Sequence, residues 1–261
     1  MVVTACNTST DRVSPSPSPA QTERRRHVSA CLLVSRLGLI DYQEAWDLQR
    51  HLADARRQDH IPDVLLLLEH PHTFTVGRRG RREHVLVPPS RLRRRGIGIL
   101  DVDRGGDVTY HGPGQLVGYP IVKLPGDRQD RVRYLRDLEQ ALLAAVRSLR
   151  VDAGLQDGLS GVWVDDDKVC ALGAKIDAYG VTTHGFALNV NVDLSYFRLI
   201  VPCGLHDKGV TSLHEVLGRH VSMRRVEQAV VMEIAGVFGL RTRGVGRQRL
   251  ERLMGPSPVV D

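Results

Sequence analysis

Strand-like segments dominate the second half of this chain, where three of them follow one another at 161–165, 168–177 and 183–192. The first two are joined by the acidic turn Asp165-Asp166-Asp167, and the third has a period of two from Phe186 onward. A period of two is typical of a strand whose two faces meet different surroundings. Because strands occur in runs, without regular alternation with helices, the sequence predicts an α+β fold in which helices pack on one side of a sheet.

Helical periodicity is confined to a few segments. Asp41 and Glu44 form an Asp-x-x-Glu capping pattern ahead of apolar residues at helical spacing, which predicts a helix over 42–57. Further helices are expected at 132–149 and 226–237 with a short one capped by Ser212, and further strands at 28–37, 64–68, 107–111 and 116–122. We expect 77–98 to be a long basic loop with one helical turn at 89–95.

The chain has 261 residues, 42% of them hydrophobic, which is enough for one domain with its own core. Residues 1–27 are polar and proline-rich and are predicted to be a disordered leader; 28–240 would be the folded domain and 241–261 a polar tail. No apolar run is long enough to span a bilayer. The four cysteines are scattered, without a C-x-x-C pair or metal-ligand spacing, so the sequence predicts neither a disulfide framework nor a zinc site. Cysteines without a disulfide pattern favour a location in the reducing cytoplasm.

Positive charge is concentrated in one segment of a chain whose net charge is +6. Eight arginines lie between Arg78 and Arg95, against the single acid Glu83. The segment is interpreted either as a solvated loop or as a patch for an acidic protein or a nucleic acid. No aromatic residue lies among these arginines, which weakens the nucleic-acid interpretation.

Lysine is rare among the 36 basic residues, with only four examples: Lys123, Lys168, Lys175 and Lys208. Arginine cannot lose its proton in a protein, whereas lysine can serve as a base. These four lysines are therefore the candidates for acid–base chemistry.

A glycine-rich segment runs from Arg104 to Gln115, with four glycines and one proline. Glycine permits tight turns and close approach of a ligand to the backbone. The spacing matches neither a Walker A loop nor a dinucleotide fingerprint, so a pocket lined by backbone is favoured over a phosphate cradle, and a purely structural turn stays open. The small residues of Ala171-Leu172-Gly173 either ease packing or open a groove for an extended ligand.

Cys203 lies between Pro202 and Gly204. It is either a small buried hydrophobe or a reactive thiol with bare backbone N–H groups beside it, suited to a developing oxyanion. A thiol with an ordinary pKa of about 8.5 is only a few per cent thiolate near neutrality, so a nucleophile needs a nearby cation. Spacing does not choose among the candidates for that cation, which are His111, His184, His206, Lys168, Lys175 and Lys208.

Four blocks of the sequence together resemble the lipoyl(octanoyl) transferase family. They are Glu69-His70-Pro71 with Thr75-Val76-Gly77; Arg104 through Gln115 followed by Leu116-Val117-Gly118-Tyr119-Pro120; Gly161-Val162-Trp163 with Lys168-Val169-Cys170-Ala171-Leu172-Gly173; and His184 through Leu194 running into Pro202-Cys203-Gly204. The resemblance covers about residues 30–238. It implies a biotin/lipoate protein ligase-like mixed sheet packed by helices, in a single catalytic domain.

The resemblance also implies an activity and a set of site residues. The activity is transfer of an octanoyl group from octanoyl-acyl carrier protein to a lysine on lipoyl domains of 2-oxoacid dehydrogenases and on the glycine cleavage H protein, the first step of endogenous lipoate biosynthesis, with no metal and no cofactor. Cys203 matches the nucleophile that becomes the acyl thioester, Lys168 matches the lysine that activates it, and Lys175 ranks second. The segments that match the acyl-binding site are Arg104, Gly105, Gly106, Asp107, Val108, Thr109, Tyr110 and His111; Ala171, Leu172 and Gly173; and Gly185, Phe186 and Ala187.

Two other functions stay open at this point. An ATP-dependent lipoate or biotin protein ligase would share the fold, would activate its acid as an adenylate and would need no nucleophilic cysteine. A basic, non-enzymatic module that binds nucleic acid or acidic proteins would bind generic DNA in a strongly salt-sensitive way and would be indifferent to loss of Cys203.

Overall fold

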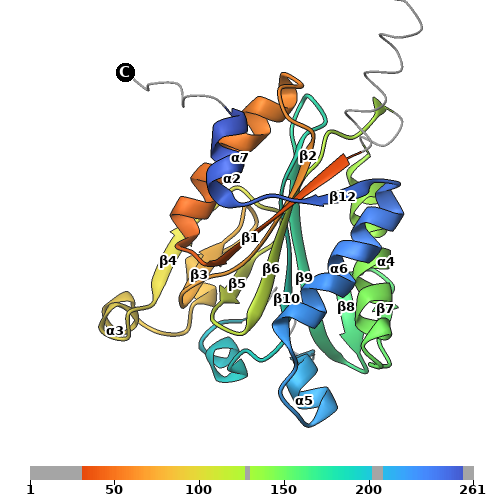
Figure 1. The fold of residues 1–261 in the computed structure, drawn as a ribbon. Helices are drawn as coiled ribbons and strands as arrows, with labels where there is room; N and C mark the ends of the chain where they lie inside the picture. Colours follow the sequence, from red (N-terminus) through yellow and green to blue (C-terminus); the bar gives the residue numbers. More distant parts are fainter. Residues whose placement is uncertain (1–30, 127–129, 202–207, 255–261) are drawn as a thin grey trace, which may run out of the picture.

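The computed structural model describes residues 31–126, 130–201 and 208–254, whose central layer is a nine-stranded mixed sheet (Figure 1). The strand order is β12-β1-β2-β6-β10-β9-β8-β7, and β11 pairs with β9. The pairs β12–β1, β1–β2 and β11–β9 are parallel, and the other pairs are antiparallel. The strands of this sheet are β1 (Cys31–Leu39), β2 (Asp63–Glu69), β6 (Gln115–Ile121), β7 (Gly154–Gln156), β8 (Leu159–Val164), β9 (Asp167–Ile176), β10 (Thr182–Asn189), β11 (Gly209–Val210) and β12 (Arg241–Gly244).

Helices cover both faces of this sheet, so the prediction of helices on one side is wrong. The helices α2 (Tyr42–Arg57) and α7 (Arg247–Met254) lie on one face, and α4 (Arg131–Ser148) and α6 (Met223–Phe238) lie on the other (Figure 1). Strand β2 shows why: Leu66 packs in the core under α2, while Leu65 and Leu67 pack in the core under α4 and α6. An unbroken apolar strand, without alternation, is what two covered faces require.

The expected helices and their caps are confirmed. The Asp41 carboxylate accepts the backbone N–H groups of Gln43 at 2.8 Å and Glu44 at 3.3 Å, which fixes the start of α2. A short helix, α5 (Leu213–Leu217), begins at Ser212, whose hydroxyl accepts the N–H of Glu215. None of the helices in the described ranges is both long and apolar enough to cross a membrane.

A second, three-stranded sheet stands beside the main one. Its order is β4-β3-β5, with bounds Gly98–Asp101, Thr73–Val76 and Val108–His111, and only β5 was expected as a strand. The expected basic loop contains a one-turn 3-10 helix, η1 (Arg82–His84), and a short helix, α3 (Pro89–Arg94), which confirms the helical turn. This sheet carries the glycine-rich segment toward the main sheet.

The C-terminal end of the domain differs from the expected polar tail at 241–261. Strand β12 pairs in parallel with β1, and α7 then returns to the α2 face, where Leu250 is fully buried. The four residues of β12 are all exposed, so they carry no hydrophobic pattern from which a strand is recognisable. The expected leader, 1–27, lies outside the described residues.

Candidate active site

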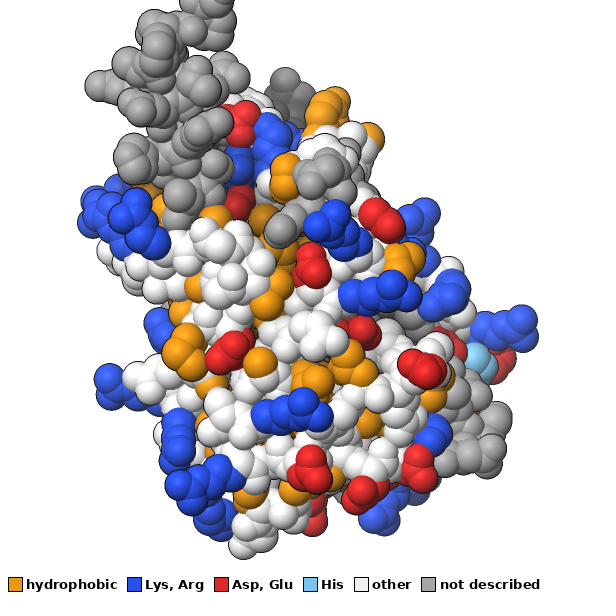
Figure 2. Space-filling model, turned by 90° about the vertical axis from the view of Figure 1, so that its right-hand side faces the viewer, with side chains coloured by type: hydrophobic (Ala, Val, Ile, Leu, Met, Phe, Trp, Pro, Cys, Tyr) orange, Lys and Arg blue, Asp and Glu red, His pale blue; other side chains and the backbone are white. Residues whose placement is uncertain are grey.

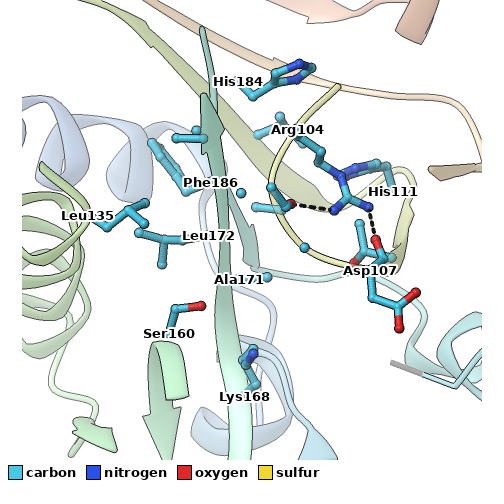
Figure 3. Close-up of a pocket in the computed structure, with 18 of the residues that line it drawn as sticks. Arg104, Asp107, His111, Leu135, Ser160, Lys168, Ala171, Leu172, His184 and Phe186 are labelled. Carbon is cyan, nitrogen blue, oxygen red and sulfur yellow. Dashed lines mark hydrogen bonds between the residues drawn. The ribbon is translucent and has the colours of Figure 1, made fainter. Parts of the chain in front are cut away.

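A cavity of about 510 Å³ has the neighbouring strands β9 and β10 on one side and the glycine-rich loop at 104–107 on the other (Figure 3). Twelve of the fourteen residues expected to bind substrate line it, and so does Lys168. Those twelve are Arg104, Gly105, Gly106, Asp107, Thr109, His111, Ala171, Leu172, Gly173, Gly185, Phe186 and Ala187. Three segments that are far apart in the sequence therefore meet around one space.

The two remaining residues, Val108 and Tyr110, belong to a different environment. Strand β5 places Thr109 and His111 toward the cavity, whereas Val108 and Tyr110 are fully buried in the core of the small sheet. Successive side chains of a strand point to opposite faces, and on β5 only the face that carries Thr109 and His111 meets the cavity. Tyr110 instead stacks on Tyr196 with ring centroids 4.9 Å apart.

Arg104 holds the glycine-rich loop in shape. Its guanidinium donates to the hydroxyl and the carbonyl oxygen of Thr75 in β3, both at 2.8 Å, and to the carbonyl oxygen of Asp107 at 2.7 Å. A further bond reaches the carbonyl oxygen of Gly105 at 3.0 Å. A buried arginine with several acceptors fixes the path of the loop over the sheet.

Gly173 and Gly185 are directly opposite each other on β9 and β10. A Cβ on Gly173 would lie 3.0 Å from the carbonyl oxygen of Gly105, and one on Gly185 would lie 2.3 Å from that of Gly118. These glycines allow close approach of backbone. At Gly173 the glycine-rich loop packs against strand β9, and at Gly185 the neighbouring strand β6 lies close to β10.

A β-bulge determines where Lys168 points. Val162 is paired with Cys170 and Trp163 with Lys168, so one step on β8 matches two steps on β9, with Val169 as the extra residue. Val169 and Cys170 are both fully buried in the core under α4 and α6. A bulge re-aims the side chains beside it. Here it places Lys168 in the lining of the cavity together with Ala171 and Gly173.

Lys175 and His184, two other candidates for the activating cation, are bound to a residue that sequence reasoning missed. Asp103 contacts Nζ of Lys175 at 2.6 Å and Nε2 of His184 at 2.7 Å. The bond to His184, with that to Lys175, holds the pKa of the Asp103 carboxyl well below its usual range, against the effect of burial. Burial lowers the pKa of His184. Figure 3 places His184 and Lys168 at opposite ends of the cavity.

His111 is held in a chain of buried amides. Its Nδ1–H donates to the side-chain oxygen of Gln115 at 2.8 Å, Gln115 donates to Asn189 at 3.0 Å, and Asn189 donates to the backbone oxygen of Thr211 at 2.9 Å. Burial lowers the pKa of His111 well below its usual value, which keeps the ring neutral. The chain of bonds connects the cavity to the segment that includes β11, beside Lys168.

The expected nucleophile Cys203 lies outside the described residues, as does His206. On the C-terminal side of that gap, Val210 is paired with Lys168, and Lys208 shares with Lys168 the lining of a small adjoining cavity. The described cysteines are Cys31 and Cys170, neither in a disulfide. Burial raises the pKa of the Cys170 thiol, and Cys31 does not line the main cavity, so neither fits the role of nucleophile.

His70 is a buried residue that contacts the lining of the cavity through Tyr119. Its Nδ1–H donates to the backbone oxygen of Ile40 at 2.8 Å, and its Nε2 accepts the hydroxyl of Tyr119, also at 2.8 Å. Tyr119 lines the cavity. Burial lowers the pKa of His70 to about 4.

This depressed pKa makes stability depend on pH. The unfolded chain takes up a proton at His70 near pH 6.5, and the folded chain does so only near pH 4, so stability is lost as the pH falls through that window. Between pH 7 and pH 5 the loss from His70 is about 2 kcal/mol in the free energy of unfolding. Urea unfolding at both pH values should show a smaller difference for His70→Gln than for the unaltered protein; equal differences would contradict this account.

Comparison with known proteins finds a matching family model and similar proteins over most of the chain. The model of the lipoyl protein ligase A/B catalytic domain matches residues 41–235. The chain is 49% identical over 211 residues to an octanoyltransferase of Roseiflexus sp. (strain RS-1), covering 80% of this chain and 88% of that protein. It is 47% identical over 221 residues to an octanoyltransferase of Rubrobacter xylanophilus, covering 84% and 98%.

Solved structures show the same fold at much lower identity. A bipartite lipoate protein ligase from Thermoplasma acidophilum, studied with its E2 lipoyl domain, superposes with a TM-score of 0.67 at 18% identity, covering 87% of this chain and 91% of that one. Lipoate-protein ligase A bound with ATP gives a TM-score of 0.66 at 16% identity, covering 87% and 92%. The likeness confirms the expected lipoate ligase-like mixed sheet.

Proposed function

The chain belongs to the octanoyltransferases of the lipoyl protein ligase A/B catalytic-domain family, and from that membership we propose that it takes an octanoyl group from octanoyl-acyl carrier protein, holds it as a thioester on Cys203 and passes it to a lysine of lipoyl domains. Octanoyl transfer is the first step of endogenous lipoate biosynthesis. The proposed acceptors are the lipoyl domains of 2-oxoacid dehydrogenases and the glycine cleavage H protein.

One observation carries the proposal: apolar side chains line one side of the cavity, and Lys168 lies at one of its ends (Figure 3). Leu135, Leu172 and Phe186 form the apolar part, which suits an acyl chain because each buried methylene contributes roughly 0.8 kcal/mol. Val210, seven residues after Cys203, is paired with Lys168. This pairing supports a role for Lys168 beside the proposed nucleophile.

The proposed reaction balances with Lys168 as the single proton carrier. In the first half, the Cys203 thiolate attacks the thioester carbonyl of the donor, and the departing pantetheine thiolate takes a proton from the Lys168 ammonium. In the second half, the neutral amine of the acceptor lysine attacks the Cys203 thioester and loses a proton to the now neutral Lys168. The Cys203 thiolate leaves, which restores the starting ion pair.

The arginine-rich segment suits docking of acidic partners, as acyl carrier protein and lipoyl domains are expected to be. All eight arginines between Arg78 and Arg95 are exposed, and among the described residues only Arg82 forms an ion pair, with Asp101. Arg79 lines the cavity, so the patch reaches its mouth. On the face that carries α4 and α6, basic and acidic side chains are intermixed instead (Figure 2). Such a patch contributes more to the association rate than to affinity.

The requirement for ATP separates this proposal from the ligase alternative. The purified chain, a lipoyl domain and octanoyl-acyl carrier protein should give octanoylated domain without ATP. Transfer that takes place only from free octanoate with ATP would contradict the proposal, because a ligase activates its acid as an adenylate.

Filling the apolar part of the cavity should change the preferred chain length. Leu135→Phe is expected to lower octanoyl transfer about tenfold, because excluding two methylenes costs roughly 1.6 kcal/mol, while hexanoyl transfer changes less. The matched control is Val132→Phe on the same helix, since Val132 is 55% exposed. Rates measured with both acyl-carrier substrates should diverge only for Leu135→Phe; an equal loss for both substrates would contradict the assignment.

A further inference from the structure

Lys168 lies against an aromatic ring. Its Nζ is 4.6 Å from the centroid of the Trp163 ring, and Trp163 is only 1% exposed. The stem of the lysine crosses the backbone of Gly161, where an added Cβ would lie 3.1 Å from its Cε. The bulge at Val169, the bare backbone at Gly161 and the indole face together fix where the ammonium lies.

The other three lysines of the chain are held differently. Lys123, Lys175 and Lys208 each form an ion pair with an aspartate, whereas the structure records no ion pair for Lys168 in the described part of the chain. Glu139, on which the charge of Lys168 acts through space, accepts the backbone N–H of Gly161 at 2.9 Å with its carboxylate. The lysine with a proposed chemical role is therefore the one paired with an aromatic ring.

This arrangement has a chemical consequence beside a thiolate. A carboxylate in contact with the ammonium would repel the nucleophile and compete with it for the positive charge. An indole face attracts a cation through its quadrupole, carries no net charge and does not accept the proton. The ring therefore orients the ammonium and leaves its charge available to the sulfur.

Building on the proposed function, we propose that Trp163 is a positioning residue for Lys168, whose indole face holds the ammonium where it supports the thiolate of the nucleophile and exchanges protons with the reacting groups. Trp163 itself touches no reacting atom in this role. Its effect on the reaction passes through Lys168 alone.

The contact can be observed without any substrate. Lysine labelled with carbon-13 at the ε position gives four signals in this protein, and Lys168→Arg identifies one of them. The Lys168 signal should be shifted upfield by the ring current of Trp163, partly restored toward the ordinary position in Trp163→Phe and fully restored in Trp163→Leu. A Lys168 signal at the ordinary position in the unaltered protein would overturn the proposal.

Fluorination tests the role in the reaction without changing the size of the side chain appreciably. The chain has two tryptophans, so 5-fluorotryptophan incorporated in a Trp46→Phe background alters position 163 alone. The ring loses electron density and keeps the indole N–H, which has no partner among the described residues. We expect the rate constant for octanoylation of Cys203 to fall roughly twofold to fivefold, and roughly tenfold or more in Trp163→Leu, with little change in the KM for octanoyl-acyl carrier protein.

The outcomes separate this inference from the proposed function. An unchanged octanoylation rate on fluorination, in protein that keeps the shifted signal, would overturn the positioning role while the transferase mechanism stands. Unaltered protein that keeps the shifted signal but is never octanoylated would overturn the proposed mechanism, and the positioning role with it.

Discussion

Replacing Cys203 with serine is expected to lower octanoyl transfer at least about a thousandfold. A serine hydroxyl is not ionised near neutrality, and a nearby ammonium does not change this enough to make it a good nucleophile. The ester that it would form also reacts with amines far more slowly than a thioester does. The measurement is the initial rate of octanoylation of a lipoyl domain, followed by mass spectrometry.

The chain offers a matched control for this substitution. Cys31→Ser changes a partly exposed cysteine of β1 that does not line the cavity, and it should leave the rate close to that of the unaltered protein. Equal losses in the two variants, or a Cys203→Ser variant that keeps more than about a tenth of the activity, would contradict a covalent role for Cys203.

Lys168→Arg should give the second large effect, and it should separate the two halves of the reaction. Arginine keeps the positive charge that supports a thiolate but cannot take a proton. Octanoylation of Cys203 should fall by roughly tenfold, because the leaving thiolate loses its proton donor, and transfer from the loaded protein to the acceptor should fall by roughly a hundredfold or more. Single-turnover experiments with each half-reaction measure the two rates separately.

Lys175→Arg is the matched control for this variant. Lys175 is ion-paired with Asp103, which an arginine can also contact, and it does not line the cavity. Its substitution should change either rate by less than about fivefold. A full rate of octanoylation in Lys168→Arg, with a large loss in Lys175→Arg, would move the activating role from Lys168 to Lys175.

Much of the fold was predictable because its signals are local. The cap at Asp41 and the helical spacing behind it are read from adjacent residues, and the run of apolar residues in β2 identifies a buried strand. The number of covered faces was predicted wrongly, as one instead of two, although the unbroken apolar pattern of β2 contained that information. Strand β12 was not recognisable, because it is short, exposed and depends on a partner far away in the sequence.

The site shows the same division between local and long-range information. The glycine-rich segment and Lys168 were found from the sequence, but the direction of Lys168 depends on a bulge whose register is set by pairing with β8. The position of the Arg104 guanidinium depends on hydrogen bonds to Thr75, which lies 29 residues earlier in the sequence. Asp103 directly precedes the glycine-rich segment, but no sequence pattern marks it as a site residue. Its role becomes visible only when the fold brings His184 and Lys175 into contact with it. The separation of Val108 from Thr109, by contrast, follows from strand alternation alone.

The most direct test of the central claim is the intact mass of the protein after incubation with octanoyl-acyl carrier protein in the absence of ATP and acceptor. The account predicts a gain of one octanoyl group, located on the peptide that contains Cys203 and removed when a lipoyl domain is added. A protein that transfers octanoyl groups to the lipoyl domain while Cys203 stays unmodified, or one that gains the group at another residue, would contradict it.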